Sequence, residues 1–528
     1  MILHLVAALA LGWPTDRLPV RSPTSVGMSP ERLEIIDRVV REGIRAGGFP
    51  GAAVVIGRQG AAVWRKGFGT LGWGVESPAV TTDGTIYDLA SLTKVVATTT
   101  AAMILYDEGK LSLDAKVADY IPAFTGKWKD EVTVRHLLTH RSGLPAGRDL
   151  WRVTRTADEA RQAVIDTPLN ARPGRYFEYS DLGADMLGLV VEALAGLPLD
   201  VFVRQRVFEP LGMRDTFFTP PDSVRDRAAP TEVTPPRGYP LQGQVHDENA
   251  YALGGVAGHA GLFGTADDLA VFAQMMLNGG IYEGARIVSD SAVRLFTQRA
   301  AGSRALGWEM AEGRHGAGEY LSPTAYGHVG FTGTSLWIDP QRNMFVILLT
   351  NRVHAARARR PATVIADVRA DLADAAALAV TDEELRISVM PAAFRADRAV
   401  NWNKPLRSRR SRYKRSRSRT SSANTAAAKK AAAAKGSSAS KAKASAKTSA
   451  AKSSAAKSKA GAAAASAAAK SKASASSTTA KGRVSSATKA KPAAKARATT
   501  KAKPATKTTA KTTAKKPSAK KPSAKPRF

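Results

Sequence analysis

The stretch Asp88-Leu89-Ala90-Ser91-Leu92-Thr93-Lys94 places a serine three residues before a lysine, after a strand-like segment and before an alanine-rich run. If Ser91 lies in the first turn of a helix, Lys94 lies on the same face, with about 5–6 Å between the two Cβ atoms. A neighbouring base turns a weak serine hydroxyl into a nucleophile, and a lysine whose pKa is lowered by burial can be that base. The free N–H groups of a helix N-terminus would also stabilise an oxyanion beside Ser91.

The Ser-x-x-Lys spacing is not specific by itself, because it recurs at Ser440/Lys443 inside a low-complexity segment. The flanking residues distinguish Ser91. Thr85–Tyr87 predicts a strand before it, and Val95–Leu105 predicts a helix after it. The motif alone leaves two interpretations open: Ser91 is a nucleophile, or it only caps a helix.

The composition divides the chain into two parts. The whole chain carries 78 Lys and Arg against 45 Asp and Glu, a formal charge of +33. Residues 401–528 contain 36 of the basic residues and no acidic one, so the preceding part, with 42 basic and 45 acidic side chains, is nearly neutral. Branched apolar and aromatic side chains concentrate in that first part, enough for one large domain or two interlocked ones. The chain contains no cysteine, which excludes disulfides and thiolate metal sites.

We expect three regions along the chain. Residues 1–12 include the apolar run Ile2–Leu11, which is too short to span a bilayer and resembles the hydrophobic part of a secretion signal without the usual basic segment. Residues 25–380 form the predicted folded domain, and residues 398–528 a disordered basic tail. The N-terminal run favours export to the periplasm or the exterior. A frayed N-terminus on a cytoplasmic protein is the alternative.

The secondary-structure pattern predicts an α/β (α+β) fold. Ala52–Ile56 and Ala61–Gly67 form one predicted hairpin, and Ser335–Ile338 and Met344–Thr350 form another. Most of residues 95–280, between them, is predicted as helices and long loops. The simplest architecture is one antiparallel sheet built from N- and C-terminal strands, with flanking helices and an inserted helical subdomain. Ser91 would then lie at the seam, where clefts form.

Two helices are predicted next to these hairpins. Residues 29–44 begin with a Ser-Pro start and continue with apolar residues at helical spacing. A second helix is predicted from Pro361 through Leu372, and we expect the folded part to end near Val380. Leu306–Met310 is a candidate for a further strand.

Two more motifs follow Ser91 and Lys94 along the chain. Tyr179-Ser180-Asp181 follows a turn, and His328-Val329-Gly330-Phe331 precedes the second hairpin. In this order the three motifs resemble those of the serine β-lactamase and penicillin-binding protein superfamily, and most of all the class C enzymes, D-alanyl-D-alanine carboxypeptidases and esterases of that fold. The resemblance covers roughly residues 25–379 and includes Leu137–Leu144 and Gly258–Gly264. It implies a β-lactamase/transpeptidase-like fold and a serine hydrolase that acts through an acyl-enzyme.

The resemblance also implies a role for each matched residue. Ser91 is the expected nucleophile. Tyr179 works with Lys94 as general base and later protonates the leaving group. Asp181 stands where the family more often has Asn, so its carboxylate would stabilise protonated Lys94 and oppose a Tyr179 phenolate. The alternative is that Tyr179 is a core aromatic residue.

The third motif departs further from the family, which has Lys-Thr-Gly there. Gly330 lets the strand approach the substrate closely, and the resemblance implies an oxyanion hole made by the backbone N–H groups of Ser91 and Phe331. Val329 lacks the hydroxyl that helps to bind a substrate carboxylate, and His328 is largely neutral at pH 7. We therefore expect a site less anion-selective than a lactamase, in a broad ester or peptide hydrolase, with β-lactam turnover ranked lower.

Other chemistries have weaker signals. His136 and His140 have the spacing of two zinc ligands on a helix, but Leu137 stands where a metalloprotease has Glu. Residues 246–248 and His259 would complete a metal set only if folding gathered them. The chain has no Gly-x-Ser-x-Gly elbow, phosphate-binding glycine loop or dinucleotide fingerprint. We expect neither a metal nor a cofactor.

A proline-rich loop over residues 216–250 ends in Val245-His246-Asp247-Glu248-Asn249-Ala250. A connection of this length is usually functional or disordered. Its last six residues resemble a subgroup signature near the cleft mouth. Two interpretations stay open: they contact substrate, or they only anchor the loop.

From Lys404 the chain opens with Arg-Ser repeats and continues as Lys, Ala, Ser and Thr, a composition similar to linker-histone tails. Such a segment lacks a core and repels itself, and it binds polyanions such as DNA, RNA or anionic envelope polymers by counterion release. A rival function follows, in which the hydrolase-like domain is a non-catalytic scaffold for polyanion binding. The set Ser91, Lys94 and Tyr179 favours the enzyme.

Overall fold

Six strands form one antiparallel sheet in the computed structural model, which describes residues 17–312, 316–354 and 361–402. These residues all belong to the first of the chain's two units, Met1–Lys429. The strands lie in the order β2-β1-β11-β10-β9-β8. Their bounds are Ala61–Gly69, Gly51–Arg58, Met344–Thr350, Ser335–Asp339, Tyr326–Val329 and Glu309–Met310, in that order. This order confirms the prediction that strands from both ends of the domain form one sheet.

The first and last long strands, β1 and β11, are neighbours in the middle of the sheet. Their register runs from Ala52 opposite Thr350 to Arg58 opposite Met344. All residues of both strands are buried, because the sheet is covered on both faces. Successive side chains of β1 point to opposite faces, so Val54 packs into one hydrophobic cluster and Val55 into the other.

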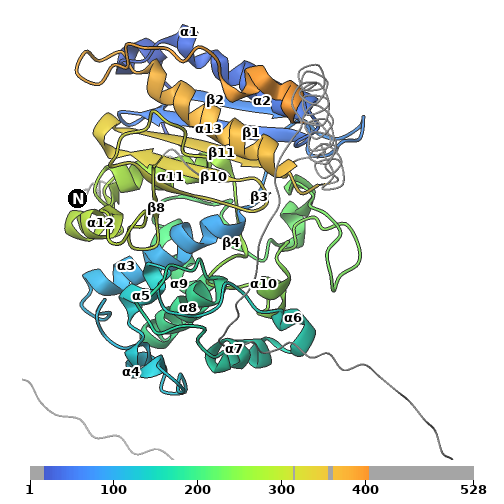
Figure 1. The fold of residues 1–528 in the computed structure, drawn as a ribbon. Helices are drawn as coiled ribbons and strands as arrows, with labels where there is room; N and C mark the ends of the chain where they lie inside the picture. The colour runs from blue at the N-terminus through green and yellow to red at the C-terminus, as the bar shows by residue number, and fades with distance from the viewer. Residues whose placement is uncertain (1–16, 313–315, 355–360, 403–528) are drawn as a thin grey trace, which may run out of the picture. The chain divides into compact units, whose positions relative to one another are not determined.

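One face of the sheet is covered by three helices from the two ends of the domain (Figure 1). They are α1 (Pro30–Leu33), α2 (Ile35–Arg45) and α13 (Pro361–Ala379). Val39 of α2 and Val364 of α13 belong to the same buried cluster as Val54. This layer supports the sheet from the side opposite the helical region.

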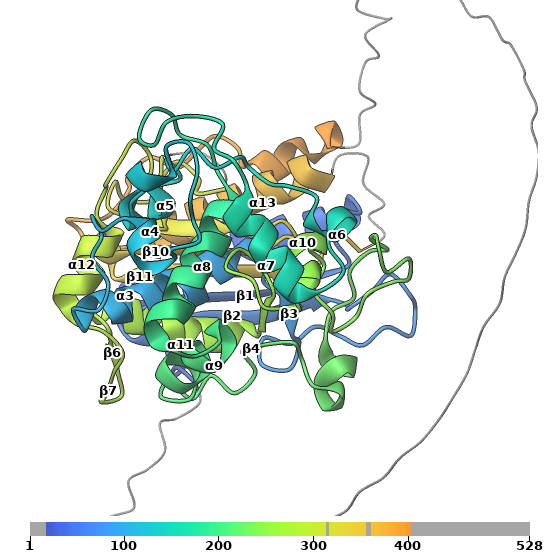
Figure 2. The same ribbon diagram turned by 90° about the horizontal axis from the view of Figure 1, so that it is seen from below.

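The other face carries α11 (Ala266–Leu277) and, beyond it, the inserted helical region (Figure 1). The longest helix of that region, α8 (Asp181–Ala195), has several shorter helices packed around it (Figure 2). These are α3 (Thr100–Asp107), α4 (Val117–Tyr120), α5 (Val134–Leu138), α7 (Ala157–Asp166) and α9 (Leu199–Val203), with α6 (Leu150–Val153) next to α7. The prediction of an inserted helical subdomain is confirmed.

A three-stranded sheet, in the order β3-β5-β4, joins the two regions. It consists of β3 (Tyr87–Asp88), β5 (Leu262–Gly264) and β4 (Phe217–Phe218). Asp88 pairs with Phe263, so the segment just before Ser91 lies beside the segment that follows Gly258. The remaining elements are α10 (Glu248–Ala252), α12 (Asp290–Thr297), the hairpin β6 (Ile281–Tyr282) and β7 (Ala285–Arg286), and short helical segments at Pro23–Val26, Lys129–Glu131, Arg204–Phe208, Asp222–Arg227, Pro340–Arg342 and Arg395–Asn401.

The helix after Ser91 differs from the predicted one. Ser91 lies in a single 3₁₀ turn, η2 (Ala90–Leu92), and Lys94–Thr99 forms a π-helical segment, η3, before α3 begins. Lys94 and Thr98 both donate to backbone carbonyls of residues 258–259, at 3.1 and 2.7 Å. Local propensity cannot anticipate such partners, and short π-segments are frequent at functional sites. The strand expected at 306–310 is also shorter, since only Glu309–Met310 pairs.

Packed residues continue beyond Val380, the expected end of the domain. Trp402 is 2% exposed, and its indole N–H donates to Asp367 of α13 at 2.7 Å. Arg395 bonds to Asp371 and Asp374, also on α13, at 3.0 and 2.8 Å. Residues 381–402 therefore complete the layer around α13.

The expected secretion-signal segment, residues 1–12, and the tail from residue 403 onward lie outside the described residues. Within the described ranges, no single helix has both the length and the apolar character needed to cross a membrane. Helix α8 and the helical segment 199–208 meet these two criteria only as a pair, and the chain bends by 71° between them.

Candidate active site

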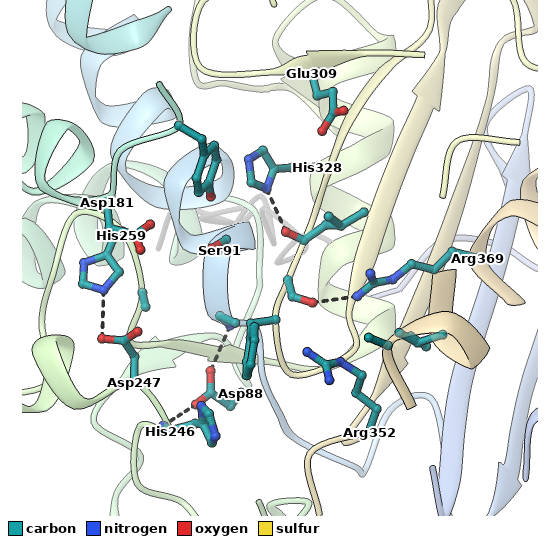
Figure 3. Close-up of a pocket in the computed structure, with 18 of the residues that line it drawn as sticks. Asp88, Ser91, Asp181, His246, Asp247, His259, Glu309, His328, Arg352 and Arg369 are labelled. Carbon is teal, nitrogen blue, oxygen red and sulfur yellow. Dashed lines mark hydrogen bonds and ion pairs between the residues drawn. The ribbon is translucent and has the colours of Figure 1, made fainter. Parts of the chain in front are cut away.

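The turn that presents Ser91 is held by the carboxylate of Asp88. Its two oxygens accept the backbone N–H groups of Ala90 at 2.8 Å and His246 at 2.7 Å (Figure 3). Ala90 has φ +48°, a left-handed conformation that a residue with a Cβ rarely adopts. Strained backbone of this kind persists where its surroundings hold it in place, often at functional sites. Asp88 therefore fixes the position from which Ser91 enters the pocket.

Lys94 lies next to the Ser91 hydroxyl, as the motif predicts. Its Nζ is 3.0 Å from Ser91 Oγ, 3.1 Å from the backbone oxygen of His259 and 2.7 Å from Asp181 Oδ1. Its side chain is 4% exposed, whereas that of Asp181 is 35% exposed. The amine thus makes three polar contacts inside the fold and one of them is ionic.

The pKa of Lys94 lies above its ordinary value, which reverses the expectation of a lysine whose pKa is lowered by burial. Burial lowers the pKa, but the charge of Asp181, followed by the phenol of Tyr179, outweighs it. Burial would likewise raise the pKa of Asp181, yet the charges of Lys94 and His259 hold it below the usual range. Lys94 and Asp181 are therefore an ammonium and a carboxylate at neutral pH.

Tyr179 lies in an aromatic cluster next to Lys94. Its ring centroid is 5.0 Å from Lys94 Nζ, 4.6 Å from the His140 ring and 5.9 Å from the His328 ring. The guanidinium of Arg304 lies 5.5 Å from the same centroid. Tyr179 therefore lies between two cations and two imidazoles, in contact with the cavity.

Both imidazoles beside Tyr179 are neutral. Burial, together with the charges of Arg304 and Lys94, lowers the pKa of His140 to about 3 and that of His328 well below its ordinary value. Nδ1 of His140 accepts the backbone N–H of Ser180 at 3.1 Å. Nδ1 of His328 lies 2.9 Å from the backbone oxygen of Val329. The expectation of a largely neutral His328 is confirmed, and the cation that the family places in the third motif is absent from that position.

Gly330, the first residue after β9, permits a close approach to the Ser91 turn. A Cβ on Gly330 would lie 2.6 Å from the backbone oxygen of Leu89 and 2.1 Å from Thr334 Oγ1. Two hydroxyl groups hydrogen-bond the segment after β9 to the segment before Ser91: Thr332 donates to Asp88 O at 2.7 Å, and Thr334 donates to Leu89 O at 2.9 Å. The sequence leads us to expect that this glycine lets the strand approach the substrate, whereas the contacts in the structure show a close approach between the strand and the turn that carries Ser91.

Phe331 follows Gly330 and lies at the pocket mouth with 61% of its side chain exposed. Its ring stacks with His246 at 5.7 Å, and the Arg352 guanidinium lies 4.4 Å from its centroid. Residues 245–250 thus reach the pocket at His246, Asp247 and Glu248, all of which line it.

These groups converge on one cavity of about 770 Å³ (Figure 3). Its walls include all of the predicted site residues apart from Lys94, whose amine lies 3.0 Å from the Ser91 hydroxyl: Ser91, Tyr179, Asp181, His328, Gly330 and Phe331. The three motifs, separated by more than 80 residues each in sequence, therefore meet at the seam between the sheet and the helical region, where the sequence placed the cleft.

His259 forms a buried charged array behind Lys94. Its Nδ1 is 2.7 Å from Asp185 and its Nε2 is 2.9 Å from Asp247. Burial lowers the pKa of His259, but the two carboxylates outweigh it and raise the pKa well above the usual value. Because the backbone oxygen of His259 also binds Lys94, this array fixes the floor of the site.

The rival zinc interpretation finds no support in the geometry. His136 Nδ1 accepts from Thr133 N at 3.2 Å, and His140 Nδ1 accepts from Ser180 N. His246 pairs with Glu232 at 3.0 Å. Over residues 17–312, 316–354 and 361–402, no group of three or more His, Asp or Glu side chains is arranged to hold a metal ion.

Five residues of the site carried no role in the sequence analysis. Two of them left a signal: Asp185 is a lone carboxylate in an apolar helical run, and Arg352 comes just after the last buried strand. Asp88 lies inside the quoted motif and was given no function. Nothing in the spacing of Arg304 or Arg369 connects either residue to the cleft.

The fold and this constellation define a serine hydrolase of the β-lactamase and penicillin-binding protein type. The chain belongs to the beta-lactamase family, whose model matches residues 36–370.

Curated relatives support this assignment. A protein of Escherichia coli (strain K12) that bears the provisional name D-alanyl-D-alanine carboxypeptidase is 35% identical over 371 residues, which cover 63% of this chain and 85% of the relative. A Bacillus subtilis (strain 168) protein named N-acetylmuramyl-L-alanine amidase is 34% identical over 367 residues, covering 62% of this chain and 82% of the relative.

Solved structures show the same fold. EstCE1, described as a hydrolase with promiscuous acyltransferase activity, has a TM-score of 0.52 at 24% identity, with 64% of this chain and 98% of that one covered. A penicillin-binding protein homologue from Caulobacter crescentus has a TM-score of 0.52 at 23% identity, with 64% and 97% covered. At these identities the likeness concerns the fold alone.

Proposed function

We propose that this hydrolase acts through an acyl-enzyme on Ser91 and cleaves peptides that end in D-alanyl-D-alanine or esters of similar shape. One observation carries the proposal: the Ser91 hydroxyl lies at a 770 Å³ cavity with the Lys94 amine 3.0 Å away. The names of the carboxypeptidase and amidase relatives support a peptide of the cell wall as the substrate class.

The proposed mechanism gives the proton to Tyr179. Ser91 Oγ attacks the substrate carbonyl carbon while its proton passes to the oxygen of Tyr179, which must be a phenolate to accept it. Lys94, kept as an ammonium by Asp181, stabilises the negative charge on that phenolate before the transfer. The backbone N–H groups of Ser91 and Phe331 hold the oxyanion.

Collapse of the tetrahedral intermediate breaks the bond to the leaving group, which takes the proton from Tyr179. A water molecule then attacks the acyl-Ser91 ester by the reverse sequence and releases the acid. In this division of roles Lys94 is an electrostatic partner and not the base, because its ion pair with Asp181 disfavours the free amine. His140 and His328 are neutral and contribute no charge to the step.

Covalent labelling tests the nucleophile. A fluorophosphonate or penicillin probe should label the wild-type protein and not Ser91→Ala, while Ser112→Ala, which removes an exposed serine, should label normally. Tyr179→Phe should fold and should lose at least about 100-fold in kcat/KM for a p-nitrophenyl ester, since general acid–base catalysis contributes about that much or more. Equal labelling of Ser91→Ala and wild type would refute the assignment.

A substrate panel tests the class. We expect turnover of D-Ala-D-Ala peptides and p-nitrophenyl esters to exceed turnover of nitrocefin, because His328-Val329 replaces the Lys-Thr of lactamases. Nitrocefin turnover far above that of the esters would reverse this ranking.

We also propose export and a second binding activity. The apolar run Ile2–Leu11 and the basic composition of residues 404–528 support them, although both segments lie outside the described residues. On an exported enzyme the tail would meet anionic envelope polymers or extracellular DNA. Cell fractionation with N-terminal sequencing of the mature protein tests the first point, and a cytoplasmic protein with an intact N-terminus would contradict it.

A further inference from the structure

Two arginines line the active-site cavity opposite its carboxylates. Figure 3 shows Asp181 and Asp247 on one side of Ser91 and the guanidinium groups of Arg352 and Arg369 on the other. Arg352 follows the end of β11, and Arg369 belongs to α13. The cavity is therefore polarised across the nucleophile.

Arg369 is a buried cation without a counter-ion. Its side chain is 7% exposed, and its Nη2 donates to the backbone oxygens of Gly330 at 2.6 Å and Thr334 at 2.7 Å. It forms no ion pair with any carboxylate in the described part of the chain. Burial, followed by the charge of Arg352, lowers its pKa to about 9. Arg369 thus stabilises the third motif and leaves a positive charge beside it.

Arg352 is half-buried, and its guanidinium makes no hydrogen bond or ion pair within residues 17–312, 316–354 and 361–402. Its one close partner is the Phe331 ring, 4.4 Å away. Burial lowers its pKa, and the more distant charge of Glu232 opposes this only in part. Its five N–H donors are therefore free for a group in the cavity.

Two other arginines inside this fold have carboxylate partners. Arg58, 1% exposed, pairs with Asp382, and Arg395 pairs with Asp371 at 3.0 Å and Asp374 at 2.8 Å. Buried charges in proteins are usually paired in this way, since leaving water without compensation is costly. Two neighbouring guanidinium groups without a carboxylate, on the wall of an open cavity, indicate an anionic ligand.

We propose that Arg352, supported by Arg369, binds a carboxylate of the substrate. This inference rests on the proposed function, since a peptide cut by a carboxypeptidase ends in a carboxylate close to the scissile bond. Phe331 carries both the expected oxyanion N–H and the ring over which Arg352 lies, so the bound carboxylate is near the reacting carbonyl. A planar guanidinium binds a carboxylate through two parallel hydrogen bonds. The guanidinium then replaces the hydroxyl that Val329 lacks, and the site is more anion-selective than the sequence predicts.

The test compares two esters of N-acetyl-D-alanine that differ in one group of the leaving phenol, a 3-carboxylate or a 3-carbamoyl. Each kcat/KM is divided by the rate of alkaline hydrolysis of the same ester. Wild type should prefer the carboxylate by roughly ten- to a hundredfold, the range expected for a hydrogen-bonded charge pair. Arg352→Gln should bring the ratio close to one, and Arg352→Lys should retain part of it.

Arg206→Gln is the matched control, because Arg206 pairs with Glu108 on the surface, away from the cavity, and the control should keep the wild-type ratio. A ratio near one in wild type, or a preference that survives Arg352→Gln, would overturn the proposal. Thermal unfolding of each variant verifies that the fold is intact.

A binding measurement separates this proposal from the proposed function. Calorimetric titration of Ser91→Ala with an N-acyl-D-alanyl-D-alanine and with its C-terminal amide should show about tenfold tighter binding of the free acid, and Arg352→Gln in the same background should abolish the difference. If wild type hydrolyses neither ester, the proposed function fails, and the titration still decides the carboxylate site. Equal binding of acid and amide counts against the site whatever the enzyme hydrolyses.

Discussion

The Lys94 amine and the Asp181 carboxylate form a 2.7 Å ion pair, and the same amine lies 3.0 Å from the Ser91 hydroxyl oxygen. In the family that the motifs resemble, the residue at position 181 is more often Asn. The carboxylate keeps Lys94 charged, and in the mechanism that we propose this leaves the role of general base to Tyr179.

Replacing Asp181 with Asn should lower the pKa of Lys94, because burial would then act on the ammonium with less opposition. We expect the alkaline limb of the pH profile of kcat/KM for a p-nitrophenyl ester to move to lower pH by about one unit or more. Asp114→Asn, which removes an exposed carboxylate paired with Arg135, is the control and should leave the limb in place. An unchanged limb in Asp181→Asn would show that Lys94 is not the group titrating there.

Gly330→Ala should separate the third motif from the Ser91 turn. The added methyl would collide with the backbone oxygen of Leu89 and the hydroxyl of Thr334. We expect a loss of about 1–3 kcal/mol in the free energy of unfolding, measured in urea. We also expect kcat to fall under conditions in which the variant is still fully folded. Gly147→Ala, whose Cβ would meet no atom within 4 Å, should change neither. Wild-type kcat in Gly330→Ala would argue against an oxyanion hole at this position.

The pH dependence of stability should reveal the Asp185–His259–Asp247 array. A histidine whose folded-state pKa is raised stabilises the fold fully below its unfolded pKa of about 6.5, and this contribution is lost as pH rises towards the folded value. The free energy of unfolding of the wild type should therefore fall between pH 6.5 and 8.5 by up to about 1.4 kcal/mol per pH unit.

His259→Gln should be less stable at pH 6.5 and should show a shallower slope over the same range. His354→Gln, which removes a ring bonded to the backbone oxygen of Thr231, provides the matched control and should keep the wild-type slope. Parallel slopes for wild type and His259→Gln would mean that His259 is not charged in the folded protein.

Removing residues 404–528 should separate the two proposed activities. The truncated protein would lose 36 basic residues and no acidic one, and should no longer be retained on DNA at low salt. Its kcat/KM for esters should stay within about twofold of wild type, because Arg395 and Trp402, which pack against α13, are kept. Retention of the truncated protein on DNA would place the polyanion site in the folded domain.

The sequence by itself was sufficient for the two hairpins and the shared sheet, and for the proposal of Ser91 as nucleophile. Strands such as β1 and β11 are long apolar runs bounded by turn residues, and such patterns depend on local chemistry. Ser91, Lys94, Tyr179, Asp181 and Gly330 were identified because their motifs are short and keep their order along the chain.

Only the tertiary structure decided how these residues are charged and what else surrounds them. Burial alone would predict a lysine with a lowered pKa, whereas the 2.7 Å contact with Asp181 reverses the direction. Arg352 and Arg369 reach the cavity from β11 and α13, more than 20 residues after Gly330, and no spacing rule connects them to it. The physical reason is that electrostatic interactions depend on distances across the seam between sheet and helices, and those distances exist only once the segments have packed together.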